Sequence, residues 1–196
     1  EISLGLVGSE MCIRDSRCID RPIRPLFPKD LRNDCSVVAT VMSVDPDCSP
    51  EITAAIGVSA AIAISDIPWD GPISSVNVGI VDGEIVINPT LEQRAKTDLT
   101  LTVASTADLV AMIEAGGNEI DDDTMFNAIM AGHEENKKIV KFIQGIVDEV
   151  GKPKFAYESS DPDPEIMKEI EDFCIEDVKK ALDTDDKLVR DEALLP

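Results

Sequence analysis

The sequence predicts an α/β (α+β) fold, in which a mixed sheet packs with helices and a separate helical piece follows. Segments rich in β-branched residues, several with alternating apolar and polar positions, are interleaved with segments whose apolar residues recur every three or four positions. Residues 153–163, rich in Pro, Ser and Asp, then interrupt the pattern. With 196 residues, 43% of them hydrophobic, the chain is long enough for one domain with a core plus an appendage.

The first elements are a helix end, a strand and a small-residue helix. Residues 17–27 predict the end of a helix that two prolines terminate. Residues 34–44 are apolar and β-branched, which predicts a buried strand. Residues 50–65 predict a helix with Ser49 at its N-cap, and its many alanines allow it to lie close to a sheet. For Gly57-Val58-Ser59 within it we expect tight packing.

Two antiparallel pairs come next. Residues 73–88 predict a hairpin around Asp82-Gly83, a turn pair that tolerates positive φ. After a short helix at 91–96, residues 99–105 alternate and residues 109–114 return beside them. The whole stretch therefore favours a largely antiparallel sheet.

The clearest helix spans residues 121–150, with one apolar face that includes His133. A single histidine on such a face is typical of a hydrogen-bonded core group, and no Ser or Cys nucleophile can be tied to it by spacing. We expect a main domain over residues 17–152, a linker over 153–163 and the start of an all-helical domain over 164–196. That last part is acidic and suits a solvated or interacting helical surface.

The segment Glu1–Ser16 (EISLGLVGSEMCIRDS) resembles translated sequencing-adaptor read-through. We therefore expect it to be non-native and set it aside from the fold, although an ordinary N-terminal segment is the alternative. The chain starts without Met and ends just after an acidic helical segment, so we expect both ends to be truncated.

The formal net charge is −21, which excludes a broad nucleic-acid-binding surface over most of the chain. Residues 1–33 carry six basic and five acidic side chains, whereas 34–196 carry 12 and 34. Any RNA contact should therefore be local. No apolar run reaches the length of a membrane span, so no membrane partner is expected. The five cysteines form no CxxC pair and there is one histidine, so we expect neither a zinc site nor a disulfide framework. This use of cysteine is typical of proteins in the reducing cytoplasm.

Signature motifs for nucleotide binding, zinc hydrolysis or nucleophilic hydrolysis are absent. Residues 45–51 (DPDCSPE) superficially resemble a calcium loop. They lack its central glycine and are interrupted by prolines, so we interpret them as a turn followed by a helix cap.

Arg21 and Arg24 are the candidate binding residues, within the stretch DRPIRPLFP. Arginine forks can bind phosphate oxygens in a bidentate way, and the prolines hold the backbone that carries them. The alternative is that these arginines pair with carboxylates such as Asp20, which is the commoner use of arginine. Spacing alone leaves both interpretations open.

Seven motifs in order resemble those of bacterial polynucleotide phosphorylases, also called polyribonucleotide nucleotidyltransferases, over residues 17–196 without a gap. These motifs are IDRPIRPLFP, VVATVMSVDP, PEITAAIGVSAAIAIS, GPISSVNVGIVDGEIVINPT, DLTLTVAST, AGHEE and GKP. The resemblance implies the later part of the family's first RNase PH-like domain (ribosomal protein S5 domain 2-like) and the start of its all-helical domain.

The resemblance also implies an activity. The family degrades single-stranded RNA from the 3′ end, because inorganic phosphate attacks the last phosphodiester and releases a nucleoside diphosphate. Its cofactor is Mg²⁺, its members are homotrimers that also meet other RNA-degradation proteins, and it acts in the cytoplasm. Such a reaction depends on positioning and charge neutralisation more than on a covalent nucleophile.

The resemblance argues against catalysis within this segment. Aligning the family's active-domain turn with Val103-Ala104-Ser105-Thr106 puts Thr100 at an aspartate position and Thr102 at a lysine position. The phosphate-binding serine region would fall at Ser59. Hydroxyls neither hold a metal as a carboxylate does nor neutralise phosphate, so we expect no catalytic residue and no Mg²⁺ site here. Arg21 and Arg24 would instead line the RNA path or support the ring.

Three hypotheses follow. The first is a piece of a phosphorolytic enzyme that supplies scaffold and RNA path. The second is a non-catalytic RNA-binding or assembly subunit of an exosome-like ring. The third is an acidic protein-interaction domain, which predicts no RNA affinity at all.

Overall fold

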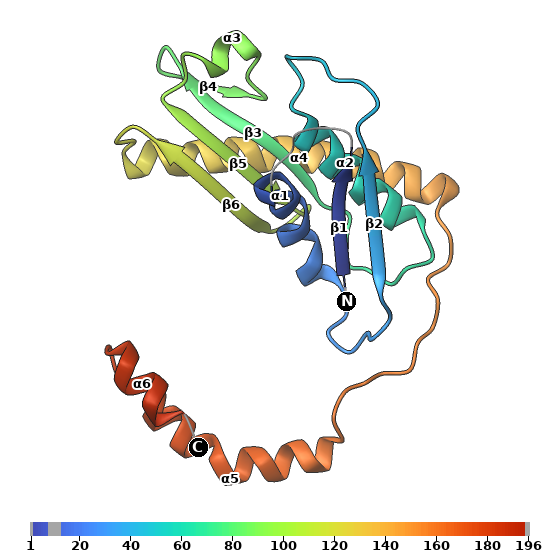
Figure 1. The fold of residues 1–196 in the computed structure, drawn as a ribbon, viewed down its shortest axis with the longest axis vertical. Helices are drawn as coiled ribbons and strands as arrows, with labels where there is room; N and C mark the ends of the chain where they lie inside the picture. Colours follow the sequence, from blue (N-terminus) through green and yellow to red (C-terminus); the bar gives the residue numbers. More distant parts are fainter. Residues whose placement is uncertain (1, 8–12, 195–196) are drawn as a thin grey trace. The chain divides into compact units, whose positions relative to one another are not determined.

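The computed structural model describes residues 2–7 and 13–194, and side chains from Ser16 onward. The chain forms two compact units, Glu1–Glu158 and Ser159–Pro196. Figure 1 labels their elements. The mixed α/β composition agrees with the sequence prediction, and so does the order of the main helices and strands from residue 13 onward, whereas the strand at Ile2–Val7 was not predicted.

A four-stranded antiparallel sheet is the centre of the first unit, with the strand order β4-β3-β5-β6. The strands are β3 (Ser74–Val81), β4 (Glu84–Ile87), β5 (Leu99–Ser105) and β6 (Val110–Gly117). The predicted hairpin turn is confirmed, because Asp82 and Gly83 adopt φ values of 53° and 83°. The short helix α3 (Leu91–Arg94) connects β4 to β5 and begins with a capping box at Thr90.

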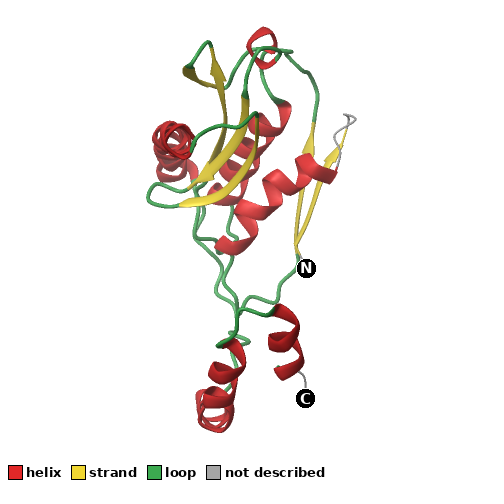
Figure 2. Cartoon of the chain, turned by 90° about the vertical axis from the view of Figure 1, so that its left-hand side faces the viewer, coloured by secondary structure: helices red, strands yellow, loops and turns green. Residues whose placement is uncertain are grey.

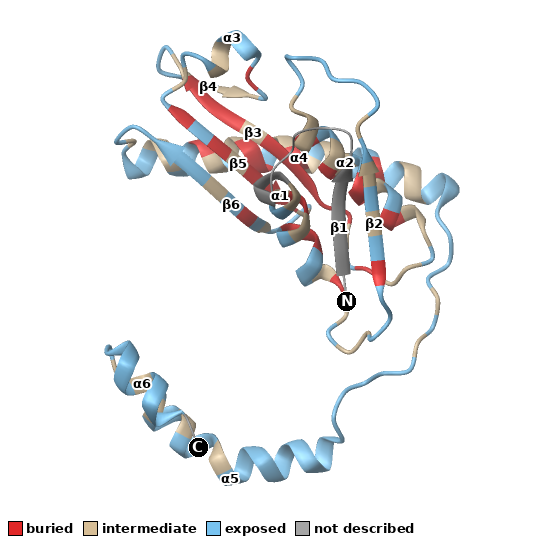
Figure 3. Cartoon of the chain, in the orientation of Figure 1, coloured by how far each residue is buried: buried red, intermediate tan, exposed pale blue. Residues whose placement is uncertain are grey.

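The helix α4 (Asp122–Val150) covers one face of this sheet. The apolar residues of β3 and β5 that face it form one core cluster with Ala128, and five of the strand residues are 0–1% exposed: Val76, Val78, Leu99, Leu101 and Val103. Gly132 allows this close approach, since a Cβ there would lie 3.0 Å from side-chain carbons of Val78 and Val103. Figure 3 shows the buried residues concentrated in these strands.

Two helices, α1 (Ile13–Ile23) and α2 (Pro50–Ile64), pack against the opposite face, where Ala104 and Met112 join their core cluster. Figure 2 shows the sheet with helices on both sides. Pro22 lies inside the last turn of α1 instead of ending it, and the 3₁₀ helix η1 (Arg24–Leu26) follows directly. Ser49 occupies the N-cap position of α2, but its side chain does not cap the helix.

The strand β2 (Cys35–Thr40) lies beside these helices and pairs in parallel with β1 (Ile2–Val7), from Ile2 opposite Cys35 to Val7 opposite Thr40. The burial of β2 alternates, so Cys35 is buried whereas Val38 is 64% exposed. β1 belongs to the segment 1–16, which the sequence predicts to be non-native. The origin of that segment stays a prediction, and its residues 1 and 8–12 lie outside the described residues.

Residues 152–157 belong largely to the predicted linker, but they are hydrogen-bonded to other residues of the first unit. The backbone N–H groups of Lys152 and Phe155 donate to the carbonyls of Ile64 and Asp66, at 3.0 and 2.8 Å. Tyr157 Oη donates to Asp30 Oδ1 at 2.8 Å. The two compact units divide between Glu158 and Ser159, and the linker stays a prediction.

The second unit contains α5 (Pro164–Leu182) and α6 (Lys187–Ala193), capped by Asp163 and Asp186 respectively. None of its described residues is buried, and apolar side chains such as Phe173, at 88% exposure, face solvent. Of the helices among the described residues, none has the length and apolar character needed to cross a bilayer.

Candidate functional site

Three arginines lie along the exposed side of α1 and η1. Arg17, Arg21 and Arg24 are spaced four and three positions apart, which places them on one helical face, called the arginine face below. Ile19 and Ile23, which point the other way, are 1% and 2% exposed. The buried isoleucines therefore fix which side of the helix carries the guanidinium groups.

The C-terminal end of this helix is anchored to the segment that precedes β3. Trp69 Nε1 donates to the carbonyl of Ile23 at 3.1 Å, and the backbone N–H of Asp70 donates to the carbonyl of Leu26 at 2.9 Å. The rings of Phe27 and Trp69 lie 6.3 Å apart between centroids, within the range of favourable aromatic contacts.

The arginines are not equivalent. Arg24 donates from Nε and Nη2 to the two carboxylate oxygens of Asp20, at 3.0 and 2.7 Å. Arg17 and Arg21 are exposed and make no hydrogen bond or ion pair with the described residues. The carboxylate pairing that the sequence left open is thus present at Arg24 and not at Arg21. Sequence reasoning missed Arg17, although its spacing from Arg21 could have identified it.

A row of polar side chains crosses the opposite face of the sheet from α4. Thr102 on β5 is paired in register with Asn77 on β3 and Glu114 on β6, and these three residues are called the polar row below. Thr102 Oγ1 donates to Asn77 Oδ1 at 2.8 Å. At the far end of the row, Cys18 Sγ of α1 donates to Glu114 Oε2 at 3.0 Å. The row is half-buried beneath the two helices.

The N-terminus of α2 contributes to the same row. Asn77 Nδ2 donates to Ser49 Oγ at 3.1 Å and, more weakly, to Glu51 Oε1 at 3.5 Å, and Ser49 Oγ itself contacts Glu51. Sequence reasoning did not select Asn77, Glu51 or Glu114, because their proximity depends on strand register and on the placement of α2.

The threonines and the serine selected from the sequence have different surroundings. Thr102 belongs to the polar row, and Thr100 lies two residues away on the same strand and is exposed. Ser59 is fully buried and its Oγ accepts a hydrogen bond from the Ile73 N–H at 3.0 Å. The structure therefore brings Thr102 to the N-terminus of α2, while Ser59 holds α2 to the start of β3.

The polar row offers hydrogen bonds without a positive charge among its described contacts. Its side chains bond to hydroxyl, amide, thiol and carboxylate groups, and the carboxylates of Glu51 and Glu114 would repel a phosphate. Among residues 2–7 and 13–194, no group of three or more His, Cys, Asp or Glu side chains is placed to hold a metal ion. Thr100 and Thr102, at the two aligned positions, offer hydroxyls and no carboxylate, the protein ligand type that Mg²⁺ favours.

The loop before α2 is rigidly held, in agreement with its interpretation as a turn. The backbone N–H of Asp47 donates to Asp45 Oδ1, and Asp47 Oδ1 accepts from the Leu91 N–H, both at 2.9 Å. Arg94 donates to the carbonyls of Pro46 and Pro89. One carboxylate oxygen each of Asp45 and Asp47 therefore serves backbone hydrogen bonds.

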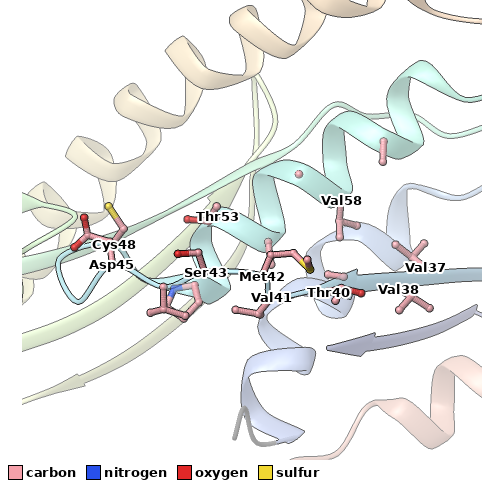
Figure 4. Close-up of a pocket in the computed structure, with 16 residues that line it drawn as sticks. Val37, Val38, Thr40, Val41, Met42, Ser43, Asp45, Cys48, Thr53 and Val58 are labelled. Atoms are coloured by element: carbon pink, nitrogen blue, oxygen red, sulfur yellow. The ribbon is translucent and has the colours of Figure 1, made fainter. Parts of the chain in front are cut away.

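An apolar groove lies between β2, the loop that follows it and α2 (Figure 4). Its volume is about 660 Å³, and it is bordered by exposed Val38 and Met42, by Val58 and by the open surface at Gly57. Such a groove suits packing against another apolar segment better than binding a phosphate.

His133 is 5% exposed on α4, and its Nδ1 has no hydrogen-bond partner among the described residues. The expected burial is confirmed, but the expected hydrogen bond is not present at that nitrogen. Nucleophilic chemistry at this position has no support in the geometry.

Two family models and several curated relatives match this chain. Residues 7–68 match the family model "3′ exoribonuclease family, domain 1", and residues 71–135 match "3′ exoribonuclease family, domain 2". Curated relatives named polyribonucleotide nucleotidyltransferase include those of Ruminiclostridium cellulolyticum, 56% identical over 93% of this chain, and Clostridioides difficile, 53% identical over 94%. The chain spans 26% of the length of each.

Among solved structures, rice (Oryza sativa) Rrp46 has a similar fold. The TM-score is 0.62 at 14% identity, over 76% of this chain and 72% of that one. At this identity the likeness concerns the fold alone, and it agrees with the RNase PH-like architecture expected from the sequence.

Proposed function

Because this chain belongs to the 3′ exoribonuclease family, we propose that it is part of a polyribonucleotide nucleotidyltransferase. Such an enzyme degrades RNA from the 3′ end, with inorganic phosphate as the attacking group and nucleoside diphosphates as products. Two family-model matches and the identity of 53–56% to the named relatives support this proposal.

Within that enzyme, we assign to this segment the role of scaffold and RNA path. The assignment depends on one observation: among the described residues, an unpaired positive charge lies on the arginine face and not at the polar row. The arginine face offers Arg21 without a partner among the described residues, whereas the described contacts of the row that contains Thr102 include carboxylates and no cation. Arg21 can therefore bind a phosphate of the RNA backbone, whereas the hydroxyl of Thr102 carries no positive charge to neutralise an attacking phosphate.

The chemical step belongs to residues outside this segment. Thr100 and Thr102 occupy the positions where the resemblance implies an aspartate and a lysine, and a hydroxyl replaces neither charge. Mg²⁺ would supply charge neutralisation to the whole enzyme. Because Thr100 and Thr102 offer no carboxylate to the ion, we assign its ligands to other parts of that enzyme.

The remaining features of the whole protein are also proposals. We infer a homotrimeric ring in the cytoplasm that acts on single-stranded RNA and binds other RNA-degradation proteins. The exposed apolar groove and the exposed apolar side chains of α5 suit a chain that packs against further protein.

Binding of a single-stranded oligoadenylate by the full-length protein tests the RNA path. Arg21→Ala combined with Arg24→Ala should weaken binding and lower the slope of log K against log salt by about 1 for each phosphate contact that is lost. Lys96→Ala is the matched control, because Lys96 is an exposed cation paired with Glu92 on a different element. Unchanged affinity and slope in a folded double variant would return the arginines to a purely structural role.

The alternative is a non-catalytic subunit of an exosome-like ring, and the fold shared with rice Rrp46 suits it equally. The contiguous coding sequence distinguishes the two. A second RNase PH-like domain downstream, with carboxylates and a lysine at the positions of Thr100 and Thr102, favours the enzyme.

A further inference from the structure

Trp69 lies where the two family-matched stretches meet. The first match ends at residue 68 and the second begins at residue 71, so Trp69 and Asp70 fall between them. The side chain is 7% exposed and sits beside Phe27, at the end of the helix that carries the arginines. A large buried aromatic residue between the two stretches can fix the position of the end of α1 relative to β3.

The indole N–H meets a specific need of α1. The last carbonyls of an α-helix have no intrahelical donor, and the Phe27 N–H, which would serve Ile23 in a continued α-helix, donates to the Arg24 carbonyl instead, at 3.2 Å. Trp69 Nε1 supplies a donor to the carbonyl of Ile23 at 3.1 Å. Because Ile23 lies between Arg21 and Arg24 in the chain, this bond holds the backbone from which both guanidinium groups extend.

The segment around Trp69 is itself held on its other side. The Ile73 N–H donates to Ser59 Oγ on α2, and Ile73 is 2% exposed. Gly71 is needed between them, because a Cβ there would lie 2.1 Å from a ring carbon of Trp69. Residues 69–73 thus connect the end of α1 to α2 and to the start of β3.

We propose that Trp69 is a positioning residue for the arginine face, acting through its hydrogen bond to the Ile23 carbonyl. The inference rests on the proposed RNA contact at Arg21. It adds that the contact depends on a residue that touches no RNA and that lies 45 or more positions away in the chain from the arginines. The direction of a guanidinium fork decides whether it can bind phosphate in a bidentate way, so loosening this helix end weakens binding.

Trp69→Phe in the full-length protein tests the proposal, because it keeps an aromatic ring and removes only the N–H donor. With a single-stranded oligoadenylate as the probe, binding should weaken by up to about tenfold, the upper bound set by the free energy of one hydrogen bond. The slope of log K against log salt should fall in the same direction as for Arg21→Ala. A melting curve checks that the variant is folded.

A thermodynamic cycle separates positioning from general stability. In an Arg21→Ala, Arg24→Ala background, Trp69→Phe should have almost no further effect on affinity, because the two guanidinium groups nearest to Ile23 in the chain are gone. Ser59→Ala is the matched control. It removes the hydrogen bond on the other side of residues 69–73 and should lower the melting temperature while leaving the salt slope unchanged.

Each result decides one question. Equal weakening by Trp69→Phe in both backgrounds, with an unchanged salt slope, would overturn the positioning role. If Trp69→Phe does not fold, Phe27→Leu is measured in its place, because it keeps the indole N–H of Trp69. A reduced salt slope in Phe27→Leu would count against a role for that N–H. If the double arginine variant alone changes nothing, the proposed RNA contact is wrong, and the inference about Trp69 falls with it.

Discussion

The two faces of the four-stranded sheet differ in what they bury. Towards α4, β3 and β5 present Val76, Val78, Leu101 and Val103, which are almost completely buried in an apolar core. Towards α1 and α2, the same sheet presents the polar row, whose side chains are half-buried and bonded to Ser49, Glu51 and Cys18. Towards α4 the sheet buries one apolar cluster, whereas towards α1 and α2 the polar row lies beside a second apolar cluster that includes Ala104 and Met112.

The polar row combines hydrogen-bonding groups with carboxylates. The polar row sits at a helix N-terminus, where an anion is favoured, yet Glu51 and Glu114 supply negative charge. Arg17 and Arg21, two cations without a partner among the described residues, lie on another surface. In this segment, hydrogen bonding at the row and phosphate attraction at the arginine face are therefore separate properties.

The largest expected effect is an absence of activity. We expect the purified 196-residue chain to release no nucleoside diphosphates from single-stranded RNA in the presence of inorganic phosphate, because Thr100 and Thr102 offer hydroxyls in place of groups that hold a metal or neutralise phosphate. Product release is measured by chromatography. Phosphate-dependent release that disappears in Thr100→Ala would show that this face is a working site.

The core face should dominate stability. Leu101→Ala, at a residue that is 0% exposed, should lower the free energy of unfolding by about 2–5 kcal/mol. Leu109→Ala is the control, because Leu109 is 71% exposed beside the same sheet and should change stability by less than about 0.5 kcal/mol. Urea unfolding of both variants measures the difference, and similar values would contradict the contrast between buried and exposed positions.

The core face was largely predictable from the sequence, and the polar row was not. Alternation at Leu99, Leu101 and Val103, and the turn pair Asp82-Gly83, are local patterns, so the hairpins and their core side could be predicted directly. The polar row depends on which strands are neighbours and on where α2 begins. Those are non-local facts, which is why Thr102 was found through a resemblance and Asn77 and Glu114 were not found at all.

The arginine face illustrates the same limit. The spacing of Arg21 and Arg24 suggested a matched pair, but the bond geometry separates them, since Asp20 holds Arg24 in a bidentate pair. Spacing reports that side chains share a helix face. It does not report which carboxylate reaches which guanidinium, or that Trp69 supports the helix end from a distant part of the chain.

Two buried serines test whether a hydrogen-bonded hydroxyl contributes more to stability than one without a partner among the described residues, and the expected effects are smaller. Ser59→Ala leaves the Ile73 N–H without its acceptor and should cost about 1–3 kcal/mol. Ser105 is equally buried, but its Oγ has no hydrogen-bond partner among the described residues, so Ser105→Ala should be neutral or slightly stabilising. Chemical denaturation resolves the two. A larger loss for Ser105→Ala would mean that its hydroxyl has an energetic role that the described contacts do not account for.

The smallest effect concerns the Asp20–Arg24 pair, and it connects the charge argument to binding. Asp20→Asn removes the carboxylate that occupies Arg24 while keeping a side chain of similar size. Because the pair is solvent-exposed, stability should change by less than about 1 kcal/mol. Affinity of the full-length protein for single-stranded RNA should rise by about twofold or more, and the salt slope should steepen, since the Asp20 carboxylate no longer competes with phosphate for Arg24. The same measurement on Glu92→Gln, which frees Lys96 away from the arginine face, provides the control. An equal gain in both variants would mean that overall net charge, and not the arginine face, sets the affinity.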